Sequence, residues 1–391
     1  MNLVPDGAAG RLGRGTAAIQ LFTKGAFDQR LIGAGDGRVP RDFFYGFLGL
    51  IARGYDARWQ QTDGAYAGAG ASADHLRERV VSRLTGLSRR HRVLKEMTED
   101  WRQSKAAVSF TDHFSLTLGD YLGRQPKRPF AAGLFHGLSD IQNRLPALGQ
   151  MTGDRYIRRA LAGLDHVGFF GPADRDEAVR RYGLEQEKTS IYPFGIDADF
   201  WSPGDGDATP EPNVLSVGSD PSRDFATLAA APIDAPVRII TRLKVDVPAG
   251  RDVEVTSGHY FESPLDDVGL RDLYRKATVV VVTLKDVFQP TGYSVCLQAM
   301  ACGRPVVLSD IKGLWAPGLY KDGEHCLLVP PGDPRAMAAS VNRLLGDTGL
   351  RERLGKAARQ VTLDHFPLSR MDDGLEALVL RAPGMERPCR G

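Results

Sequence analysis

Residues 286–310 read DVFQPTGYSVCLQAMACGRPVVLSD and follow the run Thr278–Thr283, which holds four consecutive valines. Such a run is typical of a strand that is covered on both faces. The loop at 290–294 ends where a predicted helix, Ser294–Ala301, begins, so free N–H groups and the positive end of the helix dipole point into the loop. The pattern predicts an anion site suited to a diphosphate, which Gly292 lets the backbone approach closely.

Short apolar runs alternate with helical patterns on both sides of this segment, which is typical of βαβ units with parallel sheets. In the C-terminal half we expect strands at Asn213–Val217, Val237–Thr241, Thr278–Thr283, Pro305–Leu308 and Cys326–Val329. We expect helices there at Phe225–Ala230, Val268–Lys276, Ser294–Ala301, Pro334–Leu345, Glu352–Thr362 and Leu368–Leu380.

The N-terminal half shows the same alternation. Its predicted strands are Ala17–Thr23, Ala106–Phe110, Phe130–Phe135 and His166–Phe170. Its predicted helices are a long one at Asp74–Trp101 and a shorter one at Asp176–Tyr182, and the poorly periodic stretch Gly54–Ala71 is predicted to be a loop.

The stretch 202–212 concentrates Pro, Gly and Asp, as an exposed hinge does. We therefore expect one domain over residues 1–200 and another over 201–365. In the remainder, 366–391, we expect a helix that packs back on the first domain and then a disordered end at 385–391. Two parallel sheets that face each other across a cleft would place a ligand at the carboxyl ends of their strands.

Composition excludes several classes of function. The 50 basic and 48 acidic residues give a net charge of only +2, which argues against a nucleic-acid binder. The cysteines, Cys296, Cys302, Cys326 and Cys389, form no CxxC pair, so we expect no metal knuckle and no disulfide framework, and we expect the first three to be buried. No apolar stretch approaches the roughly 20 residues needed to span a bilayer, and residues 1–15 lack the apolar core of a secretion signal. We therefore expect a cytoplasmic protein, with peripheral membrane contact left open.

The segment Ala299–Val307, AMACGRPVV, resembles the C-terminal domain of glycosyltransferase family 4 position for position. Asp310, Gly313 and the run Asp322–Asp333 continue the similarity, and Ile191–Asp197 resembles the family's crossing between domains. The resemblance covers about residues 165 to 380 and is clearest in the C-terminal half.

This resemblance implies a GT-B fold, with an N-terminal acceptor-side domain and a C-terminal domain that binds a nucleotide-diphosphate sugar. It implies a retaining transfer of the sugar to a sugar, lipid-linked or small-molecule acceptor, without a metal or another cofactor. Two other functions stay open: a nucleotide-sugar epimerase or inverting transferase on the same fold, and a GT-B module that binds a sugar-nucleotide or a partner transferase without turnover.

Both glutamates of the family's Glu-x7-Glu motif are replaced here. The first, which contacts sugar hydroxyls in the family, falls on Pro290, and the second, which contacts the ribose, falls on Gln298. The Gln298 amide oxygen can still accept a hydrogen bond from a ribose hydroxyl, although without the assistance of a negative charge. The donor site that the resemblance implies consists of Gly218, Ser219, Gln289, Pro290, Thr291, Gly292, Tyr293, Ser294 and Gln298.

The diphosphate also needs fixed positive charge. In the family an Arg and a Lys supply it; here Ser219 falls on the Arg position and Arg223 lies near the Lys position. We predict Arg223 and Lys285 as the cations that offset the charge developing on the diphosphate, with Arg242 or Lys244 as other candidates.

In the N-terminal half, His136 follows the apolar run Phe130–Phe135. The family often carries a His at this strand end beside the reacting sugar, so we predict His136 as a catalytic residue; Asp112 and His113 lie at another strand end. The Asp-x-Asp at 197–199 has a metal-binding spacing but falls in the interdomain crossing, and we interpret it as structural.

The predicted helix at 75–95 is strongly basic: Arg77, Arg79, Arg83, Arg89, Arg90, Arg92 and Lys95 stand against the single acid Glu78. An apolar stripe of Leu76, Val80, Leu84 and Leu87 runs between them. Such a helix either packs its stripe on the domain or lies on an anionic membrane.

Overall fold

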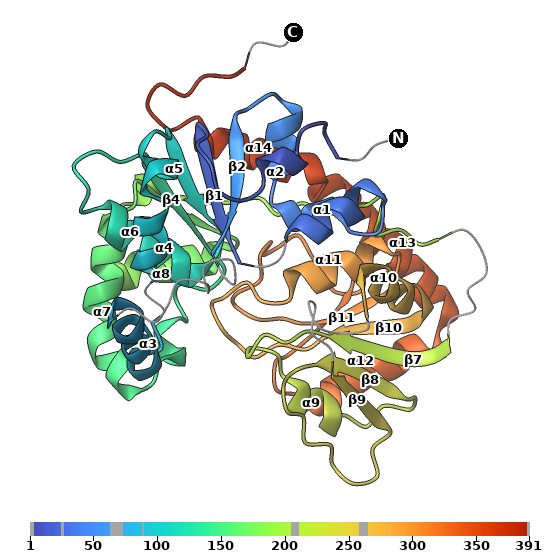
Figure 1. Ribbon diagram of the computed structural model, residues 1–391. Coiled ribbons are helices and arrows are strands. Elements are labelled where there is room, and N and C mark those ends of the chain that lie inside the picture. Colours follow the sequence, from blue (N-terminus) through green and yellow to red (C-terminus); the bar gives the residue numbers. More distant parts are fainter. Residues whose placement is uncertain are drawn as a thin grey trace. The chain divides into compact units, whose positions relative to one another are not determined.

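The computed structural model describes residues 4–24, 27–62, 73–87, 90–204, 211–257 and 265–388. The chain divides into an N-terminal unit, Met1–Asp36 with Phe43–Phe194 and Ser369–Gly391, and a C-terminal unit, Gly37–Asp42 with Gly195–Leu368. Each unit is built on its own sheet and is described by itself (Figure 1).

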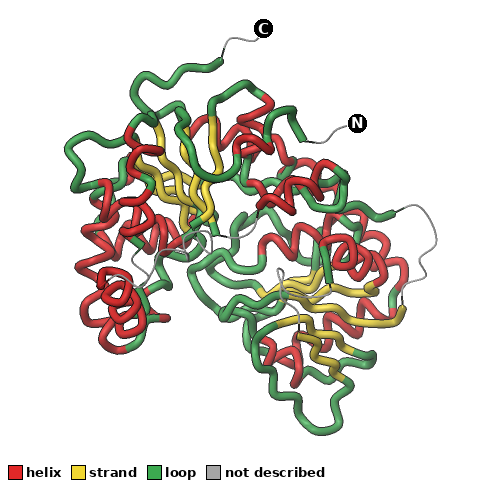
Figure 2. Tube along the Cα trace, viewed as in Figure 1, coloured by secondary structure: helices red, strands yellow, loops and turns green. Residues whose placement is uncertain are grey.

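The described part of the N-terminal unit contains a six-stranded parallel sheet in the order β2-β1-β3-β4-β5-β6. The strands are drawn in yellow in Figure 2. Its strands are β1 (Ile19–Thr23), β2 (Ala57–Gln61), β3 (Ala106–Ser109), β4 (Phe130–Phe135), β5 (His166–Phe169) and β6 (Thr189–Ile191). The four strands predicted from apolar runs are confirmed. The loop prediction for 54–71 is wrong at β2, which pairs with β1, and its residues 63–71 lie outside the described ranges.

Helices surround this sheet. They are α1 (Phe27–Gly35), α2 (Phe47–Ala52), α3 (Ala73–Thr85), α4 (His91–Glu96), α5 (Thr98–Arg102), α6 (Asp112–Leu122), α7 (Ala147–Ala162), α8 (Pro172–Tyr182) and α14 (Leu368–Val379), with short 3₁₀ turns at η1 (Ala9–Arg11), η2 (Arg41–Phe44), η3 (Gln142–Arg144) and η4 (Gln186–Lys188). The single helix predicted at Asp74–Trp101 is wrong, because the chain turns at Gly86, whose φ of 70° is left-handed.

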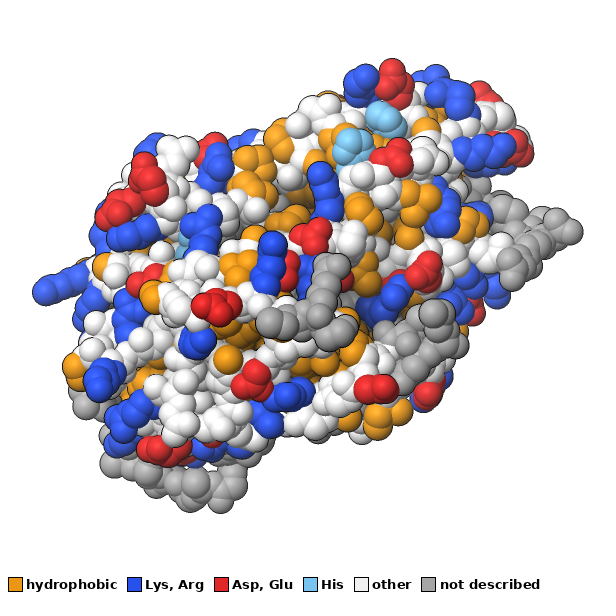
Figure 3. Space-filling model, turned by 90° about the horizontal axis from the view of Figure 1, so that it is seen from above, with side chains coloured by type: hydrophobic (Ala, Val, Ile, Leu, Met, Phe, Trp, Pro, Cys, Tyr) orange, Lys and Arg blue, Asp and Glu red, His pale blue; other side chains and the backbone are white. Residues whose placement is uncertain are grey.

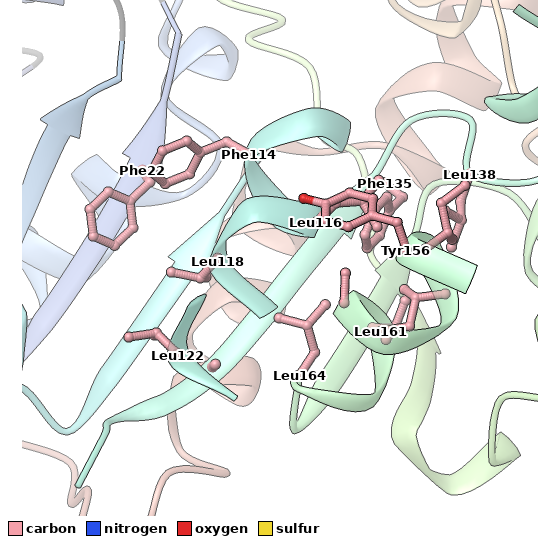
Figure 4. Packing of buried hydrophobic residues seen from close by; sticks show 14 of the residues in the cluster. Phe22, Phe114, Leu116, Leu118, Leu122, Phe135, Leu138, Tyr156, Leu161 and Leu164 are labelled. Carbon is pink, nitrogen blue, oxygen red and sulfur yellow. The ribbon is translucent and has the colours of Figure 1, made fainter. Parts of the chain in front are cut away.

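The core of the N-terminal unit lies between the sheet and α6 and α7. Phe114, Leu118 and Leu122 project from one side of α6 toward the strands, and Tyr156 and Leu161 come from α7 (Figure 4). At the carboxyl end of the chain, α14 belongs to this unit: Tyr192 donates its hydroxyl to the carbonyl of Met371 at 3.3 Å.

The tail that follows α14 is described as far as residue 388. Within the segment expected to be disordered, residues 385–388 form no helix or strand, and Arg387 lies 3.7 Å from the carboxylate of Glu376. Residues 389–391, which include Cys389, lie outside the described ranges.

The described part of the C-terminal unit contains a second six-stranded parallel sheet in the order β12-β11-β10-β7-β8-β9. Its strands are β7 (Glu211–Val217), β8 (Val237–Thr241), β9 (Val253–Ser257), β10 (Ala277–Val282), β11 (Val306–Ser309) and β12 (Leu327–Val329). Its helices are α9 (Phe225–Ala230), α10 (Asp267–Lys276), α11 (Tyr293–Ala301), α12 (Pro334–Gly346) and α13 (Thr348–His365). The predicted alternation is confirmed in both units, and β9 is a strand that the sequence did not reveal.

The valine run forms β10, whose residues are all buried between β7 and β11. Three cysteines of this unit, Cys296, Cys302 and Cys326, are buried as predicted. On the face shown in Figure 3, basic and acidic side chains are intermingled, in keeping with the small net charge. Among the described residues, no helix has both the length and the apolar character needed to cross a membrane.

Candidate functional site

Two loops at the carboxyl edge of the C-terminal sheet are bonded to each other. The loop at 218–224 joins β7 to α9, and the loop at 283–292 joins the neighbouring strand β10 to α11. The N–H of Lys285 donates to the carbonyl of Ser222 at 2.9 Å, which fixes the two loops side by side. This edge, at the carboxyl ends of parallel strands, is where α/β sheets build ligand sites.

Arg223 lies in the first of these loops with only 5% of its surface exposed. Its guanidinium packs between Gly218 and Gly292: a Cβ at Gly218 would be 2.5 Å from Nε, and one at Gly292 would be 3.1 Å from Nη1. Both of these nitrogens are buried without a hydrogen-bond partner among the described residues. Burial lowers the pKa of Arg223, and the nearby carboxylate of Asp220 opposes that shift. A buried cation with unpaired donors is costly for the protein alone, so the arrangement fits a ligand that brings acceptors.

The N-terminus of α11 lies against the same guanidinium. Its N-cap is Gly292, with a left-handed φ of 79°, and no side chain caps the helix. By contrast, four other helices of this unit each begin at an aspartate whose carboxylate accepts a backbone N–H; these caps are Asp224, Asp266, Asp333 and Asp347. No side chain therefore caps the first turn of α11, where the helix dipole adds positive potential.

The loop before α11 contains a further unsatisfied group. The hydroxyl of Thr291 is buried and has no hydrogen-bond partner within the described chain. Gln289 is also buried, and its amide donates to the carboxylate of Asp220 at 3.2 Å, which ties the second loop to the first. Asp220 thus ties the two loops together and opposes the positive charge of Arg223. Its position after β7 in the sequence did not indicate this role.

The other residues predicted for the donor site differ in how far they are buried. The hydroxyl of Ser219 accepts a hydrogen bond from the N–H of Arg242 at 3.0 Å. Lys285 is exposed and donates from Nζ to the carbonyl of Pro221 at 2.9 Å, so its charge lies along the first loop. Pro290 and Tyr293 are buried, and Ser294, in the first turn of α11, is half-buried. Lys244, named as another candidate cation, pairs with Asp246 at 3.0 Å.

Gln298 lies one turn further along α11 and is buried. Its amide oxygen accepts a hydrogen bond from the hydroxyl of Tyr274 at 3.3 Å. Tyr274, on α10, is fully buried, and nothing in the sequence distinguished it from an ordinary core residue. The oxygen expected to accept from a ribose hydroxyl is therefore already engaged once, and a carbonyl oxygen has one more lone pair to offer.

His136 belongs to the N-terminal unit, where it follows β4. The backbone N–H of His136 donates to the carboxylate of Asp112 at 2.7 Å, and its ring Nε2 lies 3.0 Å from the carbonyl oxygen of Phe110. Because a carbonyl can only accept, this contact is a hydrogen bond in any tautomer that carries a proton on Nε2. The ring stacks on Phe170 with centroids 4.4 Å apart.

Aromatic rings gather around His136 at the carboxyl edge of its sheet. We call Tyr45, Phe110, His136, Phe170 and Phe194 the aromatic cluster; the ring of Tyr45 lies within 6.4 Å of each of the other four. Tyr45 is also the one non-glycine residue with a positive φ, 46°, in the part of the chain that the structure describes. Strained backbone of this kind concentrates at functional sites. Of these five residues only His136 was predicted from the sequence, because the five come from loops that lie far apart in the chain.

Arg41 accounts for the Asp-x-Asp at 197–199. It donates to the carboxylate of Asp197 through its backbone N–H, Nε and Nη2, at 2.7–2.9 Å, and to Asp199 at 2.6 Å. Although burial opposes the shift, these bonds hold the pKa of Asp197 below its usual value. Among the described residues there is no group of three His, Cys, Asp or Glu side chains arranged to hold a metal ion.

Residues 234–347, which include α11 and the loop before it, match the family model described as glycosyl transferases group 1. The D-inositol 3-phosphate glycosyltransferase of Acidothermus cellulolyticus is 30% identical over 255 residues, which is 57% of this chain and 56% of that protein. The enzyme of the same name from Streptomyces bingchenggensis is 28% identical over 217 residues, 47% of this chain and 46% of that protein. The chain thus spans about half the length of the curated relatives it matches.

Solved structures resemble nearly the whole chain. Sucrose-phosphate synthase from Thermosynechococcus elongatus has a TM-score of 0.66 at 20% identity, covering 93% of this chain and 98% of that one. The chain has the GT-B fold. The Anabaena protein HepE, solved in complex with UDP-glucose, has a TM-score of 0.64 at 15% identity and covers 93% and 99%. The predicted GT-B architecture is confirmed by these structures, and the resemblance to glycosyltransferases is confirmed by the family match and the curated relatives.

Proposed function

We propose that this GT-B chain is a glycosyltransferase that binds the diphosphate of a nucleotide-sugar at the carboxyl edge of the C-terminal sheet. The observation that carries the proposal is Arg223, a buried cation with two unpaired nitrogens beside the uncapped N-terminus of α11. A diphosphate would supply both the missing acceptors and the opposing charge. The match of residues 234–347 to group 1 glycosyl transferases supports this choice of anion, as do the complexes of HepE with UDP-glucose and with UDP.

In the proposed reaction, the bond between the anomeric carbon and the diphosphate oxygen breaks while an acceptor hydroxyl oxygen bonds to that carbon. The hydroxyl proton leaves toward the departing diphosphate. Arg223 and the first-turn amides of α11 stabilise the negative charge that develops on this leaving group, and Lys285 adds a more exposed cation. His136 would act beside the reacting sugar, as the family resemblance implies.

The proposed transfer retains the anomeric configuration and uses no metal. Retention comes from the family resemblance, and we place no covalent glycosyl-enzyme intermediate on the path because the sequence offers no evident carboxylate nucleophile. The Asp-x-Asp pair supports a metal-independent reaction, since Arg41 already engages both of its carboxylates. The acceptor is a sugar, a lipid-linked sugar or a small molecule.

Binding without turnover is the second candidate function. Pro290 offers no polar side-chain group, and the Gln298 oxygen is engaged by Tyr274, so the two positions that carry glutamates in the family are weak partners for a sugar. An epimerase on the same fold would differ from both candidates by releasing a changed sugar without an acceptor.

The first test measures binding. Thermal shift with UDP, GDP, ADP and their sugars should identify the donor, because a ligand bound only by the native state raises the melting temperature. Arg223→Met should bind the identified nucleotide roughly 100-fold more weakly through loss of charge-assisted hydrogen bonds, while the ligand-free protein stays as stable as the wild type or becomes more so.

Arg304→Met is the matched control. Arg304 is half-buried in the same unit, and its side chain donates to the carbonyls of Cys302 and Ala277. Its loss should lower the stability of the free protein and leave the ligand-induced shift unchanged. Equal ligand-induced shifts in wild type and Arg223→Met would contradict the proposed diphosphate site.

The second test measures turnover. Release of nucleotide diphosphate with an acceptor panel, followed by NMR of the anomeric proton in the product, separates the candidates. Transfer with retained configuration is the expected result. Tight nucleotide binding with no transfer to any acceptor would favour the non-catalytic module, and a changed sugar without acceptor would favour the epimerase.

A further inference from the structure

Helix α3 turns large apolar side chains toward solvent. Leu76 is 61% exposed, Val80 48% and Leu84 54%, and their spacing of four residues aligns them in one stripe along the helix. An amphipathic helix of a globular protein normally packs such a stripe on its core. Here the fourth member of the predicted stripe, Leu87, is buried at 1% exposure, while the other three are not.

Positive charge borders this stripe. Arg79 and Arg83 are exposed and lie three residues after Leu76 and Val80, so they occupy the same side of the helix. Among the described side chains of α3, the acid Glu78 is turned away from this side, and its carboxylate accepts the N–H of Arg92 at 3.2 Å. We call Leu76, Arg79, Val80, Arg83 and Leu84 the α3 face; it is apolar along its centre and cationic along one border.

The opposite side of α3 is fixed to the N-terminal unit. The helix lies beside α7 (Figure 1). Thr85 is buried, and its carbonyl lies so close to Gly149 of α7 that a Cβ there would be 1.9 Å from the oxygen. This close approach holds the helix with the α3 face outward. Near the N-terminus of α7, Met151 adds a further apolar side chain that is 82% exposed.

We propose that the α3 face docks the protein on an anionic lipid surface. Leucine and valine side chains would enter the boundary between headgroups and acyl chains, and the arginines would pair with lipid phosphates. Charge complementarity selects this occupant, because the apolar stripe supplies affinity for any apolar surface while the arginine border favours an anionic one. The inference depends on the N-terminal unit alone and stands whether or not the donor site binds a nucleotide-sugar.

The test uses the full chain and sedimentation with vesicles. Binding to vesicles that contain phosphatidylglycerol should exceed binding to pure phosphatidylcholine, and it should weaken as salt rises from about 0.1 M to 1 M. Arg79→Gln with Arg83→Gln should lower the partition coefficient about fivefold per charge. Leu76→Ser with Leu84→Ser should lower it roughly tenfold or more.

Matched variants keep the result specific to this helix. Ile32→Ser changes an apolar residue of α1 that is 64% exposed, and Arg102→Gln with Arg335→Gln removes the same charge elsewhere; both should bind as the wild type does. No binding to phosphatidylglycerol vesicles would overturn the proposal, and so would equal losses in the matched variants. If the α3 variants instead change the mass in solution from a dimer to a monomer without changing vesicle binding, the face joins two copies of the chain and the lipid proposal is wrong.

Discussion

Both sheets are parallel and six-stranded in the described chain, with different strand orders, and their carboxyl edges differ in chemistry. We call the carboxyl edge of the C-terminal sheet the anion edge and that of the N-terminal sheet the aromatic edge. At the anion edge, two nitrogens of Arg223 have no hydrogen-bond partner among the described residues, and no side chain caps α11. At the N-terminal edge, rings dominate, and the aromatic cluster surrounds His136. The difference teaches that a parallel sheet supplies the platform and that loop residues decide its chemistry: one edge presents a buried cation and the other presents aromatic rings.

The largest effect that would sharpen this contrast is expected at the aromatic edge. His136→Ala should lower turnover roughly 100-fold, as the loss of a positioned acid–base group does, and should leave nucleotide affinity unchanged within about twofold. Steady-state kinetics and calorimetric titration measure the two quantities. The exposed His113 serves as control, and His113→Ala should keep full turnover. A loss of nucleotide affinity in His136→Ala would break the division of roles.

A second effect is expected at the anion edge. Gly292→Ala should weaken nucleotide binding roughly 30-fold, because the new Cβ would lie 2.9 Å from Val282 and 3.1 Å from Arg223 and would displace the guanidinium. Gly318 provides a control with the same backbone strain, since its φ is 80° and a Cβ there has nothing within 4 Å. Gly318→Ala should lose about 1 kcal/mol of stability in denaturant unfolding through backbone strain alone, and Gly292→Ala should lose more because its Cβ also meets neighbouring atoms; only Gly292→Ala should lose binding. Equal binding by the two would show that the loop does not shape the site.

Much of this fold was readable from the sequence, because buried parallel strands are apolar throughout. The valine run of β10 and the apolar run of β4 needed no tertiary information. Strand β2 escaped prediction for a physical reason. It carries the fully buried Gln60, whose amide donates to the side-chain oxygen of Gln20 at 2.8 Å, and this polar pair forms only after β1 and β2 have paired. The sequence could not show that partner.

The candidate site divides in the same way. That a loop with Gly292 precedes α11 was predictable, because a glycine before a helix is a local pattern; that the loop binds an anion stays a prediction. The unpaired nitrogens of Arg223 and the hydrogen bond from Tyr274 to Gln298 were not predictable, because each depends on what neighbouring segments leave unsatisfied. The exposed stripe of α3 was also unpredictable, since periodicity reports that apolar residues share a side and does not report which way that side faces.

A smaller effect would test how the anion edge recognises the rest of the nucleotide. Gln298→Leu should weaken nucleotide diphosphate binding about fivefold, the cost of one neutral hydrogen bond, and should leave inorganic pyrophosphate binding unchanged because pyrophosphate has no ribose. Competition titration with both ligands measures the difference. Equal weakening of both would mean that Gln298 acts through Tyr274 and the packing of α11 and not through the ribose.

The last comparison concerns stability alone, through a buried acid that is bonded to the loop after His136. Asp174, at the start of α8, accepts hydrogen bonds from the N–H and the hydroxyl of Ser139 in the loop after His136, and its Oδ2 has no partner among the described residues. Burial raises the pKa of Asp174 to about 7, and the bonds from Ser139 oppose the shift.

Because the folded pKa of Asp174 is above the usual one, its contribution to stability is full below about pH 4 and is lost as the pH rises through about 7. Asp174→Asn keeps an acceptor for Ser139 and cannot ionise. Between pH 5 and pH 8, urea unfolding should therefore show the wild type losing roughly 2 kcal/mol more stability than the variant. Parallel pH profiles would mean that Asp174 is ionised in the folded protein, and the aromatic edge would then hold a buried charge of its own, which would remove the contrast with Arg223.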